Sequence, residues 1–360
     1  MDITFAKKTT LDSLNSDISS YLSDTRYRID VSKSVITDNG TWNSISTLPY
    51  KFYHGSAVVY NNEIHILGSY NSSGYKAHYR FDGSSWTSVS TLPYVFHDGS
   101  VVVYNNEIHI MGSLNSYHTT KHYKWDGSSW TSVSTLPYEF DYGSAVIYNN
   151  EIHILGSYDN TKAHYKWNGS SWTSVSTLPY EFYEGSAVVY NNEIHILGGS
   201  SDKAAHYKWN GSSWTSVSTL PYKFYTGSAV VYNNEIHILG SYNSSYYTAH
   251  YKWDGSSWTS VSTLPYTFYY GSVIIYNNEI HILGGSGNTT EHYAYVFIYS
   301  ISYQLYTGMK IICDKSILTP ISSNLSEITD GYKVTSTGLV QLQSSEPISE
   351  TNRPLLTILS

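Results

Sequence analysis

Short runs of β-branched and apolar residues alternate with turn residues throughout the middle of this chain. The run Gly99 to Tyr104 (Gly-Ser-Val-Val-Val-Tyr) is followed by Asn105-Asn106 and then by Glu107 to Gly112 (Glu-Ile-His-Ile-Met-Gly). Asparagine tolerates the left-handed backbone that a two-residue hairpin turn requires. This pattern therefore predicts two antiparallel strands joined by a tight turn.

A second hairpin is expected after the polar loop that follows. Residues His122 to Trp125 precede a turn at Asp126-Gly127, and the residues from Trp130 to Leu136 alternate between apolar and polar. Alternation is typical of a strand with one buried face, and Pro137 ends it because proline cannot donate to a strand ladder. Helical periodicity is absent from the block, so we predict a unit of four strands.

This block occurs six times. The phrase Leu-Pro-Tyr recurs in steps of 44, 44, 42, 42 and 44 residues, with its proline at Pro49, Pro93, Pro137, Pro179, Pro221 and Pro265. Such a period indicates a propeller or a solenoid, because each unit can bury its faces only against its neighbours. The repeat overrides the two domains that a length of 360 residues would otherwise suggest.

The two ends of the repeat region indicate that the ring closes. The sixth block reaches its third strand at Glu291 to Val296 and then stops, while a fourth-strand sequence stands alone at Trp42 to Leu48. Closure removes the exposed sheet edges of an open array. We therefore predict an all-β fold, a six-bladed β-propeller over residues 42–296 whose last blade is completed by the N-terminal strand.

At these residues the chain resembles the kelch-repeat family. The resemblance lies in a hydrophobic strand that runs into two glycines, Glu193 to Gly199, and in the spaced aromatic pair Tyr207 and Trp214. It covers all six blades, about 70% of the chain. The chain departs from the family pattern in four glycine pairs that are Gly-Ser instead, at Gly68-Ser69, Gly112-Ser113, Gly156-Ser157 and Gly240-Ser241.

The resemblance also bears on activity. Six-bladed kelch proteins include sugar mutarotases, which implies a carbohydrate-active enzyme as one alternative. Copper oxidases built on kelch propellers need a tyrosine–cysteine crosslink, and the single cysteine here, Cys313, lies beyond the blades. The resemblance therefore argues against that enzyme class.

Comparison of the six blocks separates constant turns from variable loops. The Tyr-Asn-Asn-Glu turn is the same in all six blocks, and the Gly-Ser-Ser-Trp turn is the same in five. Two loops vary: one follows Leu-Pro-Tyr and keeps only its phenylalanine, and the other follows the glycines and absorbs the changes in length. In an up-and-down blade both loops lie at the same end of the propeller, where a rigid scaffold usually carries its binding residues. Neutral drift is the alternative, but the changes introduce Tyr, His, Asp, Glu and Lys instead of small residues.

We predict that this variable face binds a ligand. The chain has 38 tyrosines against 9 phenylalanines, and tyrosine offers a large contact area with little rotamer entropy to lose. Its ring suits the C–H face of a sugar, and neighbouring charged groups suit the hydroxyls. The candidates in the first loop are Lys51, Tyr53, His54, His97, Asp98, Glu139, Asp141, Tyr142, Glu181, Tyr183, Glu184, Lys223, Tyr225, Tyr269 and Tyr270. Those in the second loop are Tyr75, Tyr117, Tyr158, Tyr246 and Tyr247, with Tyr70 and Tyr242 among its other tyrosines.

Metal chemistry finds little support in the residue pattern. Twelve of the fifteen histidines recur at two strand positions, represented by His65 and His78, and sixfold repetition places them between blades and not around one ion. The other three, His54, His97 and His118, lie on the variable face without the spacing of a ligand set. We predict no metal and no cofactor.

Five carboxylates form an arc over three consecutive variable loops. Paired carboxylates perform glycosidase chemistry when they stand at the right separation, but an acidic rim exposed to solvent is the simpler interpretation. We therefore predict no catalytic residue. The members of the arc are Asp98, Glu139, Asp141, Glu181 and Glu184.

Charge and composition exclude several partners. The net charge of −8 and the 13% of charged residues argue against nucleic acid. The sequence has no apolar run of about eighteen residues for a membrane span, and its start, Met1 to Phe5, lacks the features of a secretory signal. One cysteine leaves no disulfide framework.

The segments that flank the repeats are expected to differ from them. In residues 1–41 the spacing of Leu11, Leu14, Ile18 and Leu22 predicts a short helix, which either packs on the propeller or serves docking and oligomerisation. Residues 297–360 alternate in places and predict a small β-rich module that could hold the propeller to a larger assembly.

The expected function is recognition without catalysis. The missing signal and the combination of a short head, near-identical repeats and a β-rich tail are similar to phage tail or capsid-accessory attachment proteins. We expect a virion-surface protein made in the host cytoplasm that binds a bacterial surface polysaccharide or glycoprotein. A sugar mutarotase and a structural or protein-interaction propeller, located in the cytoplasm, are the alternatives. Homo-oligomer formation stays open.

Overall fold

The computed structural model describes residues 2–5, 36–38, 40–71, 75–114, 119–200, 203–242, 247–285, 289–296, 299–302, 311–314, 339–341 and 355–359. The chain divides into two compact units. One is Trp42–Tyr295, and the other combines Met1–Thr41 with Val296–Ser360. The described residues contain no helix long and apolar enough to cross a lipid bilayer.

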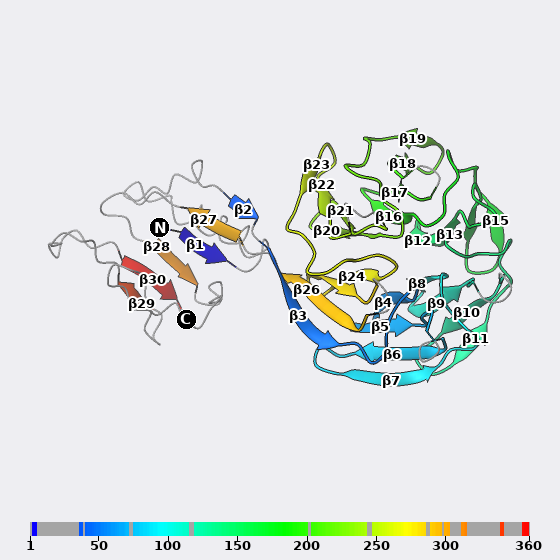
Figure 1. The fold of residues 1–360 in the computed structure, drawn as a ribbon, viewed down its shortest axis with the longest axis horizontal. Coiled ribbons are helices and arrows are strands. Elements are labelled where there is room, and N and C mark those ends of the chain that lie inside the picture. The colour runs from blue at the N-terminus through cyan, green and yellow to red at the C-terminus, as the bar shows by residue number, and fades with distance from the viewer. Residues whose placement is uncertain are drawn as a thin grey trace. The chain divides into compact units, whose positions relative to one another are not determined.

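The unit Trp42–Tyr295 consists of six four-stranded antiparallel sheets arranged in a ring, which confirms the predicted propeller (Figure 1). The first strands of the blades are β4 (Ser56–Tyr60), β8 (Ser100–Tyr104), β12 (Ser144–Tyr148), β16 (Ser186–Tyr190), β20 (Ser228–Tyr232) and β24 (Ser272–Tyr276). The second are β5 (Glu63–Leu67), β9 (Glu107–Met111), β13 (Glu151–Leu155), β17 (Glu193–Leu197), β21 (Glu235–Leu239) and β25 (Glu279–Leu283). The third are β6 (Ala77–Phe81), β10 (His122–Trp125), β14 (His164–Trp167), β18 (His206–Trp209), β22 (His250–Trp253) and β26 (Glu291–Val296). The outer strands are β7 (Trp86–Thr91), β11 (Trp130–Ser132), β15 (Trp172–Ser174), β19 (Trp214–Ser216), β23 (Trp258–Ser260) and β3 (Thr41–Thr47).

The hairpin turns have the predicted backbone. Asn105 and Asn106 have φ values of 50° and 60°, as a two-residue turn with two left-handed positions requires. The outer strands are shorter than expected in four blades, because the chain leaves the regular ladder after residues such as Ser132. The pairing continues irregularly, since the N–H of Val133 still donates to the carbonyl of His122 at 2.8 Å.

The ring closes as predicted, with β3 as the fourth strand of the last blade. Ser46 on β3 shows the equivalence in side-chain detail. Its Oγ lies 2.8 Å from His292 Nδ1 of the same blade and accepts a 2.9 Å hydrogen bond from Trp86 Nε1 of the next. In the first blade Ser90 makes the same two contacts, 3.0 Å each, with His78 and Trp130. The N-terminal strand therefore reproduces the contacts of an ordinary blade.

The hydrophobic core runs between blades. One cluster joins Tyr60 and Leu67 of the first blade to Phe96, Ile108 and Trp125 of the second, and equivalent clusters occur at other junctions. The constant phenylalanine of each repeat is fully buried. Stability thus depends on neighbouring blades, as expected for a repeat fold.

Each blade also buries a pair of histidines, one on its second strand and one on its third. In the first blade His65 Nδ1 lies 2.8 Å from His78 Nε2, and the other five blades repeat this contact at 2.8 to 2.9 Å. Burial lowers the pKa of His65 to about 4 and that of His78 to about 3. The pairs are therefore neutral, structural groups at neutral pH.

The second unit contains two three-stranded sheets, in the order β1-β27-β2 and β28-β30-β29. The described parts of residues 297–360, where a β-rich module is predicted, are strands, and two further strands lie near the N-terminus, where none is predicted. The helix expected between Leu11 and Leu22 lies outside the described residues. The strands are β1 (Asp2–Phe5), β2 (Ile36–Asp38), β27 (Tyr299–Ser302), β28 (Ile311–Asp314), β29 (Leu339–Gln341) and β30 (Leu355–Leu359).

Candidate functional site

The two variable loops of a blade are held together by the serine of its Gly-Ser pair. Ser69 is fully buried; its Oγ donates to the carbonyl of Lys51 at 2.9 Å and accepts from the N–H of Tyr53 at 3.0 Å. The N–H of Tyr70 then donates to the carbonyl of Tyr53 at 2.6 Å. The departure from paired glycines thus has a physical reason, because the hydroxyl fixes one variable loop against the other.

A ring of six residues surrounds the mouth of the central channel. Each stands just before the glycine that begins a first strand, and each N–H donates to the carbonyl of the equivalent residue one blade earlier, at 2.7 to 2.9 Å. The last of these bonds runs from His54 to Tyr270 and closes the circle. This mouth ring consists of His54, Asp98, Tyr142, Glu184, Thr226 and Tyr270.

All six residues of the mouth ring have a left-handed backbone, with φ between 54° and 59°. Side chains other than glycine and asparagine rarely adopt this conformation, and a β-branched residue such as Thr226 does so least readily. The same chain places asparagine at the left-handed positions of its hairpin turns, including Asn61 and Asn62. Side chains other than asparagine and glycine occupy the mouth ring instead, which makes it a candidate site.

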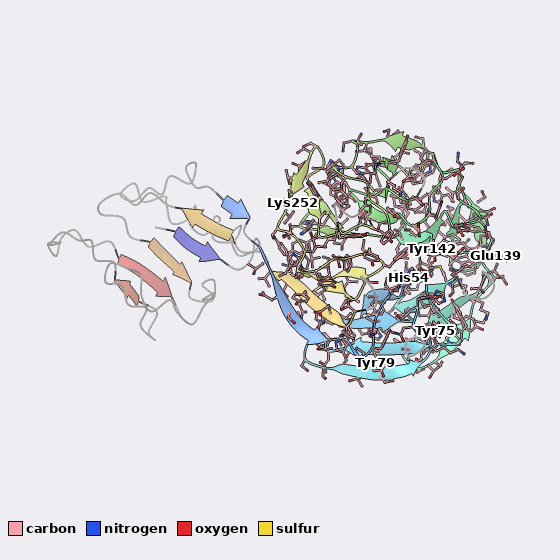
Figure 2. All side chains as sticks on the ribbon, viewed as in Figure 1. His54, Tyr75, Tyr79, Glu139, Tyr142 and Lys252 are labelled. Carbon is pink, nitrogen blue, oxygen red and sulfur yellow. The ribbon has the colours of Figure 1, made fainter. Side chains whose placement is uncertain are left out.

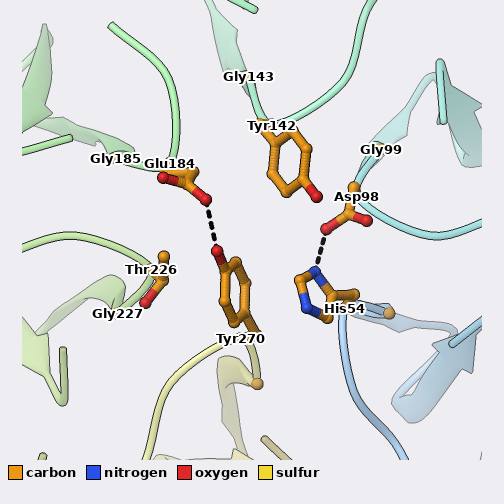
Figure 3. A pocket seen from close by; sticks show the side chains of 12 residues that line it. His54, Asp98, Gly99, Tyr142, Gly143, Glu184, Gly185, Thr226, Gly227 and Tyr270 are labelled. Atoms are coloured by element: carbon orange, nitrogen blue, oxygen red, sulfur yellow. Dashed lines mark hydrogen bonds and ion pairs between the residues drawn. The ribbon is translucent and has the colours of Figure 1, made fainter. Parts of the chain in front are cut away.

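The side chains of the mouth ring line a pocket of about 140 Å³ (Figure 3). Asp98 bonds to two imidazoles: to His54 Nδ1 through one oxygen and, at 2.8 Å, to His97 Nδ1 through the other. Across the pocket the hydroxyl of Tyr270 donates to Glu184. The Tyr270 ring stacks on His54, with centroids 3.7 Å apart and planes 23° from parallel.

The electrostatics of the pocket keep its phenols protonated. Burial raises the pKa of Tyr270, and the hydrogen bond to Glu184 raises it further. Burial also raises the pKa of Tyr142, with Asp98 and Glu184 adding to the effect. Next to them, burial and the neighbouring Tyr269 raise the pKa of Tyr53 to about 12. The pocket therefore combines two carboxylates with hydroxyl donors, and its lining includes neither lysine nor arginine.

Thr226 is a pocket residue that the sequence analysis missed. It is 6% exposed, and its buried hydroxyl oxygen has no hydrogen-bond partner. Its place in the repeat matches that of His54 and Asp98, and this equivalence was the available signal.

The structure places the first-loop candidates at different depths. Lys51, Glu139, Glu181 and Lys223 are exposed and do not line the pocket, and Figure 2 shows Glu139 toward the outer edge of the ring and His54 and Tyr142 nearer its middle. Asp141 is fully buried, with Oδ1 accepting a 3.0 Å hydrogen bond from Ser157. The proposed acidic arc is therefore wrong as a single exposed rim.

The tyrosine candidates gather around the pocket in ring contacts. The ring centroid of Tyr53 lies 5.6 Å from that of Tyr270 and 6.3 Å from that of Tyr269. The Nζ atom of Lys203 lies 3.8 Å from the ring centroid of Tyr225. Tyr117 and Tyr246, like His118, lie outside the described residues. Those contacting the neighbouring loops are Tyr75, Tyr142, Tyr158, Tyr183, Tyr247 and Tyr269.

No metal site emerges from the part of the chain that the structure describes, which has no group of three or more His, Cys, Asp or Glu side chains able to hold an ion. The two carboxylates of the pocket are each engaged by a neighbouring donor. The arrangement is suited to hydrogen bonding and to proton transfer.

Comparisons with known proteins agree with this architecture. No family model matches the chain. A stretch of 39 residues, 11% of the chain, is 51% identical to the kelch domain-containing protein SSO1033 of Saccharolobus solfataricus, and the match spans only 5% of that protein. The solved structure of YjhT superposes with a TM-score of 0.61 at 15% identity, over 72% of this chain and 99% of the other. At that identity the likeness concerns the fold. The blade topology shows that the chain is a six-bladed β-propeller, and its repeat sequence is similar to that of a kelch domain-containing protein.

Proposed function

We propose that the protein is an attachment protein that binds a neutral glycan on a bacterial surface through the variable face. The gathering of tyrosines around a pocket of carboxylates and hydroxyl donors carries the proposal. Aromatic rings stack on the C–H faces of sugars, and the carboxylates accept hydrogen bonds from sugar hydroxyls. Because Asp98 and Glu184 stand in the pocket without a lysine or arginine, an anionic sugar would be repelled there.

Binding to bacteria tests the proposal. Fluorescently labelled protein is incubated with a panel of Gram-positive and Gram-negative strains, before and after removal of their surface polysaccharide. We expect strain-specific labelling that disappears on stripping and that soluble polysaccharide inhibits. Labelling that survives stripping, or no labelling of any strain, would contradict glycan attachment.

A pair of matched variants tests which end of the propeller binds. In a Cys313→Ser background, Asn160→Cys places a thiol on an exposed residue of the variable face, and Ser170→Cys places one on an exposed constant turn. Each thiol is then coupled to a long polyethylene glycol. We expect the polymer at residue 160 to block adhesion and the polymer at residue 170 to leave it unchanged; equal effects would remove the variable face from consideration.

The proposal includes a position on a phage virion, with the unit formed by the chain ends as the attachment to the particle. The support is the order of segments along the chain, in which near-identical repeats stand between a short N-terminal segment and a β-rich C-terminal segment. Immunogold labelling of particles from a producing strain would place the protein on the tail or capsid, and its absence from purified particles would exclude this part of the proposal.

Acid–base catalysis on a sugar is a second candidate, favoured by the pairing of carboxylates with protonated phenols in one pocket. Interconversion of sugar anomers needs a base at the anomeric hydroxyl and an acid at the ring oxygen. Thr226→Tyr should fill the pocket and still fold, because tyrosine occupies the same ring position at Tyr142 and Tyr270. If the wild type accelerates mutarotation of neutral hexoses and both Thr226→Tyr and Glu184→Gln abolish the acceleration, the enzyme is identified. A wild-type rate equal to the spontaneous one excludes it.

A further inference from the structure

Three tyrosines project from the variable face at one position of the repeat, directly after the Gly-Ser pair. Among the described residues they are the most exposed large hydrophobic side chains, at 54%, 54% and 47%. They belong to the first, third and fifth blades, so they alternate around the ring. The three are Tyr70, Tyr158 and Tyr242.

The backbone shows that the positions are equivalent. In each blade the N–H of this residue donates to the carbonyl of the residue after the constant phenylalanine, at 2.6 Å for Tyr70, 3.2 Å for Tyr158 and 3.1 Å for Tyr242. Leu114 and Ser200 make the same bond in the second and fourth blades, at 3.0 and 2.9 Å. The alternation therefore lies in the side chains and not in the scaffold.

Each exposed tyrosine meets an aromatic ring of the following blade nearly edge to face. We call each such pair an aromatic corner: a half-exposed tyrosine that meets a second, less exposed ring, which in the first pair is the buried His97. The pairs are Tyr70 with His97 (5.0 Å, 73°), Tyr158 with Tyr183 (5.5 Å, 85°) and Tyr242 with Tyr269 (5.0 Å, 63°).

Two of the corners have a third ring. Tyr75 lies 6.3 Å from Tyr70 in the first corner, and Tyr247 lies 5.9 Å from Tyr242 in the last. Thr161 occupies this place in the middle corner. The carbonyls of these three residues all accept from the N–H of the next constant phenylalanine, at 2.8 Å, which establishes their equivalence. The corner at Tyr158 thus has two rings where the other two corners have three.

The two junctions that the structure describes between the corners, after the second and fourth blades, have no exposed tyrosine at this position. After the second blade Leu114 stands where the exposed tyrosines do, and the residue that would face it, Asp141, is fully buried. After the fourth blade Ser200 takes the place, and Tyr225 is covered by Lys203. Other rings link the corners, since the ring centroid of Tyr53 lies 6.3 Å from that of Tyr269 and the centroid of His54 lies 5.9 Å from that of Tyr70. What distinguishes each corner is its half-exposed tyrosine.

From this geometry we infer that the variable face holds three equivalent sugar subsites, one at each aromatic corner, and that its ligand is a polysaccharide that presents the same unit many times. The inference rests on the proposed function. A half-exposed tyrosine flanked by a perpendicular ring accepts the C–H face of one pyranose and leaves its hydroxyls to the polar groups nearby. Each subsite alone binds its sugar weakly, and a polysaccharide that occupies several subsites at once binds with a much higher apparent affinity.

The test counts subsites on the full chain. Its probes are single repeat units cut from the capsular polysaccharide that supports adhesion, and the same polysaccharide immobilised intact. By calorimetry, the wild type should bind three single units and Tyr70→Ala only two, with Tyr242→Ala behaving alike. On the immobilised polymer each single variant should lose at least about tenfold in apparent affinity, and the triple alanine variant should not bind.

Controls separate subsite loss from damage to the fold. Leu114→Ala and Ser200→Ala change the same repeat position in the intervening blades and should leave both the stoichiometry and the adhesion unchanged. Tyr70→Phe retains the ring and should restore most of the binding. Wild-type adhesion with a stoichiometry of one, or equal losses from Leu114→Ala and Tyr70→Ala, would overturn the three subsites and leave glycan attachment intact. Failure of the wild type to bind any polysaccharide would refute both.

Discussion

Acidification should unfold the propeller well before the pH at which ordinary carboxylate pairs fail. The cause is the six buried histidine pairs. Burial lowers the pKa of second-strand members such as His153 to about 4 and of third-strand members such as His164 to about 3. In the unfolded chain a histidine titrates near 6.5, so between these values the unfolded state binds more protons than the folded state.

The free energy of unfolding should therefore decrease as the pH falls. The stability contributed by the neutral pairs is complete above pH 6.5 and is lost as the pH falls toward 4 and 3. If only one histidine of each pair took up a proton on unfolding, six of them would remove about 8 kcal/mol per pH unit. That is comparable with the total stability of a domain, about 5–15 kcal/mol.

The measurement is the free energy of unfolding by urea at a series of pH values from about 7.5 to 4.5. We expect a steep fall below pH 6.5 and loss of the folded state near pH 5. The double variant His153→Gln with His164→Gln removes one titrating pair while retaining hydrogen-bonding groups, and should reduce the slope by about one sixth. A flat stability profile down to pH 5 would show that the pairs do not titrate on unfolding.

Removal of β3 should open the ring. Without this strand, the last blade loses its outer strand, and the contacts of Ser46 with His292 and Trp86 disappear. Trp42, 5.0 Å from Tyr295, and the buried Leu48 are lost as well. A free edge then remains on β26, and such an edge pairs readily with other chains.

Two fragments make the comparison. Residues 40–296 contain all twenty-four blade strands, and residues 49–296 lack only β3 and the residues next to it. We expect the longer fragment to be a monomer with one cooperative melting transition. We expect the shorter fragment to aggregate or to lose most of its free energy of unfolding, which for a domain is about 5–15 kcal/mol. Light scattering and thermal melts measure both. A synthetic peptide of residues 40–50 should restore the shorter fragment by adding the missing strand. A monomeric shorter fragment that melts within a few degrees of the longer one would contradict the role of β3.

The blade count, the ring closure and the hairpin turns were predictable because they repeat. Asn105-Asn106 specifies a turn by itself, and Trp42 to Leu48 is recognisable as a fourth strand that lacks its blade. The convergence of the two variable loops followed from blade topology alone. All of these features depend on local backbone preference and on order along the chain.

The depth of the individual loop residues could not be predicted in the same way. Asp98 and Asp141 differ by one repeat position, yet one lines the pocket and the other is buried beneath Ser157. The difference arises because Asp98, the left-handed residue before the glycine, lines the pocket, while Asp141 accepts a hydrogen bond from the buried Ser157 of the Gly-Ser pair. Neither contact is local in sequence. The aromatic corners also depend on pairs from different blades, such as Tyr158 and Tyr183, whose proximity only the ring establishes.

The left-handed backbone of the mouth ring has a consequence for the evolution of specificity. Six residues with five kinds of side chain share one φ range and one pattern of backbone hydrogen bonds, so the scaffold does not depend on which side chain is present. Glycine at any of these positions would relieve a conformational cost of about 1–2 kcal/mol. The chain thus gives up stability for side chains that face the channel, as functional sites often do. Under the proposed attachment function, single substitutions in the mouth ring would therefore exchange one ligand preference for another while the fold remains unchanged, and the protein could follow a changing cell surface.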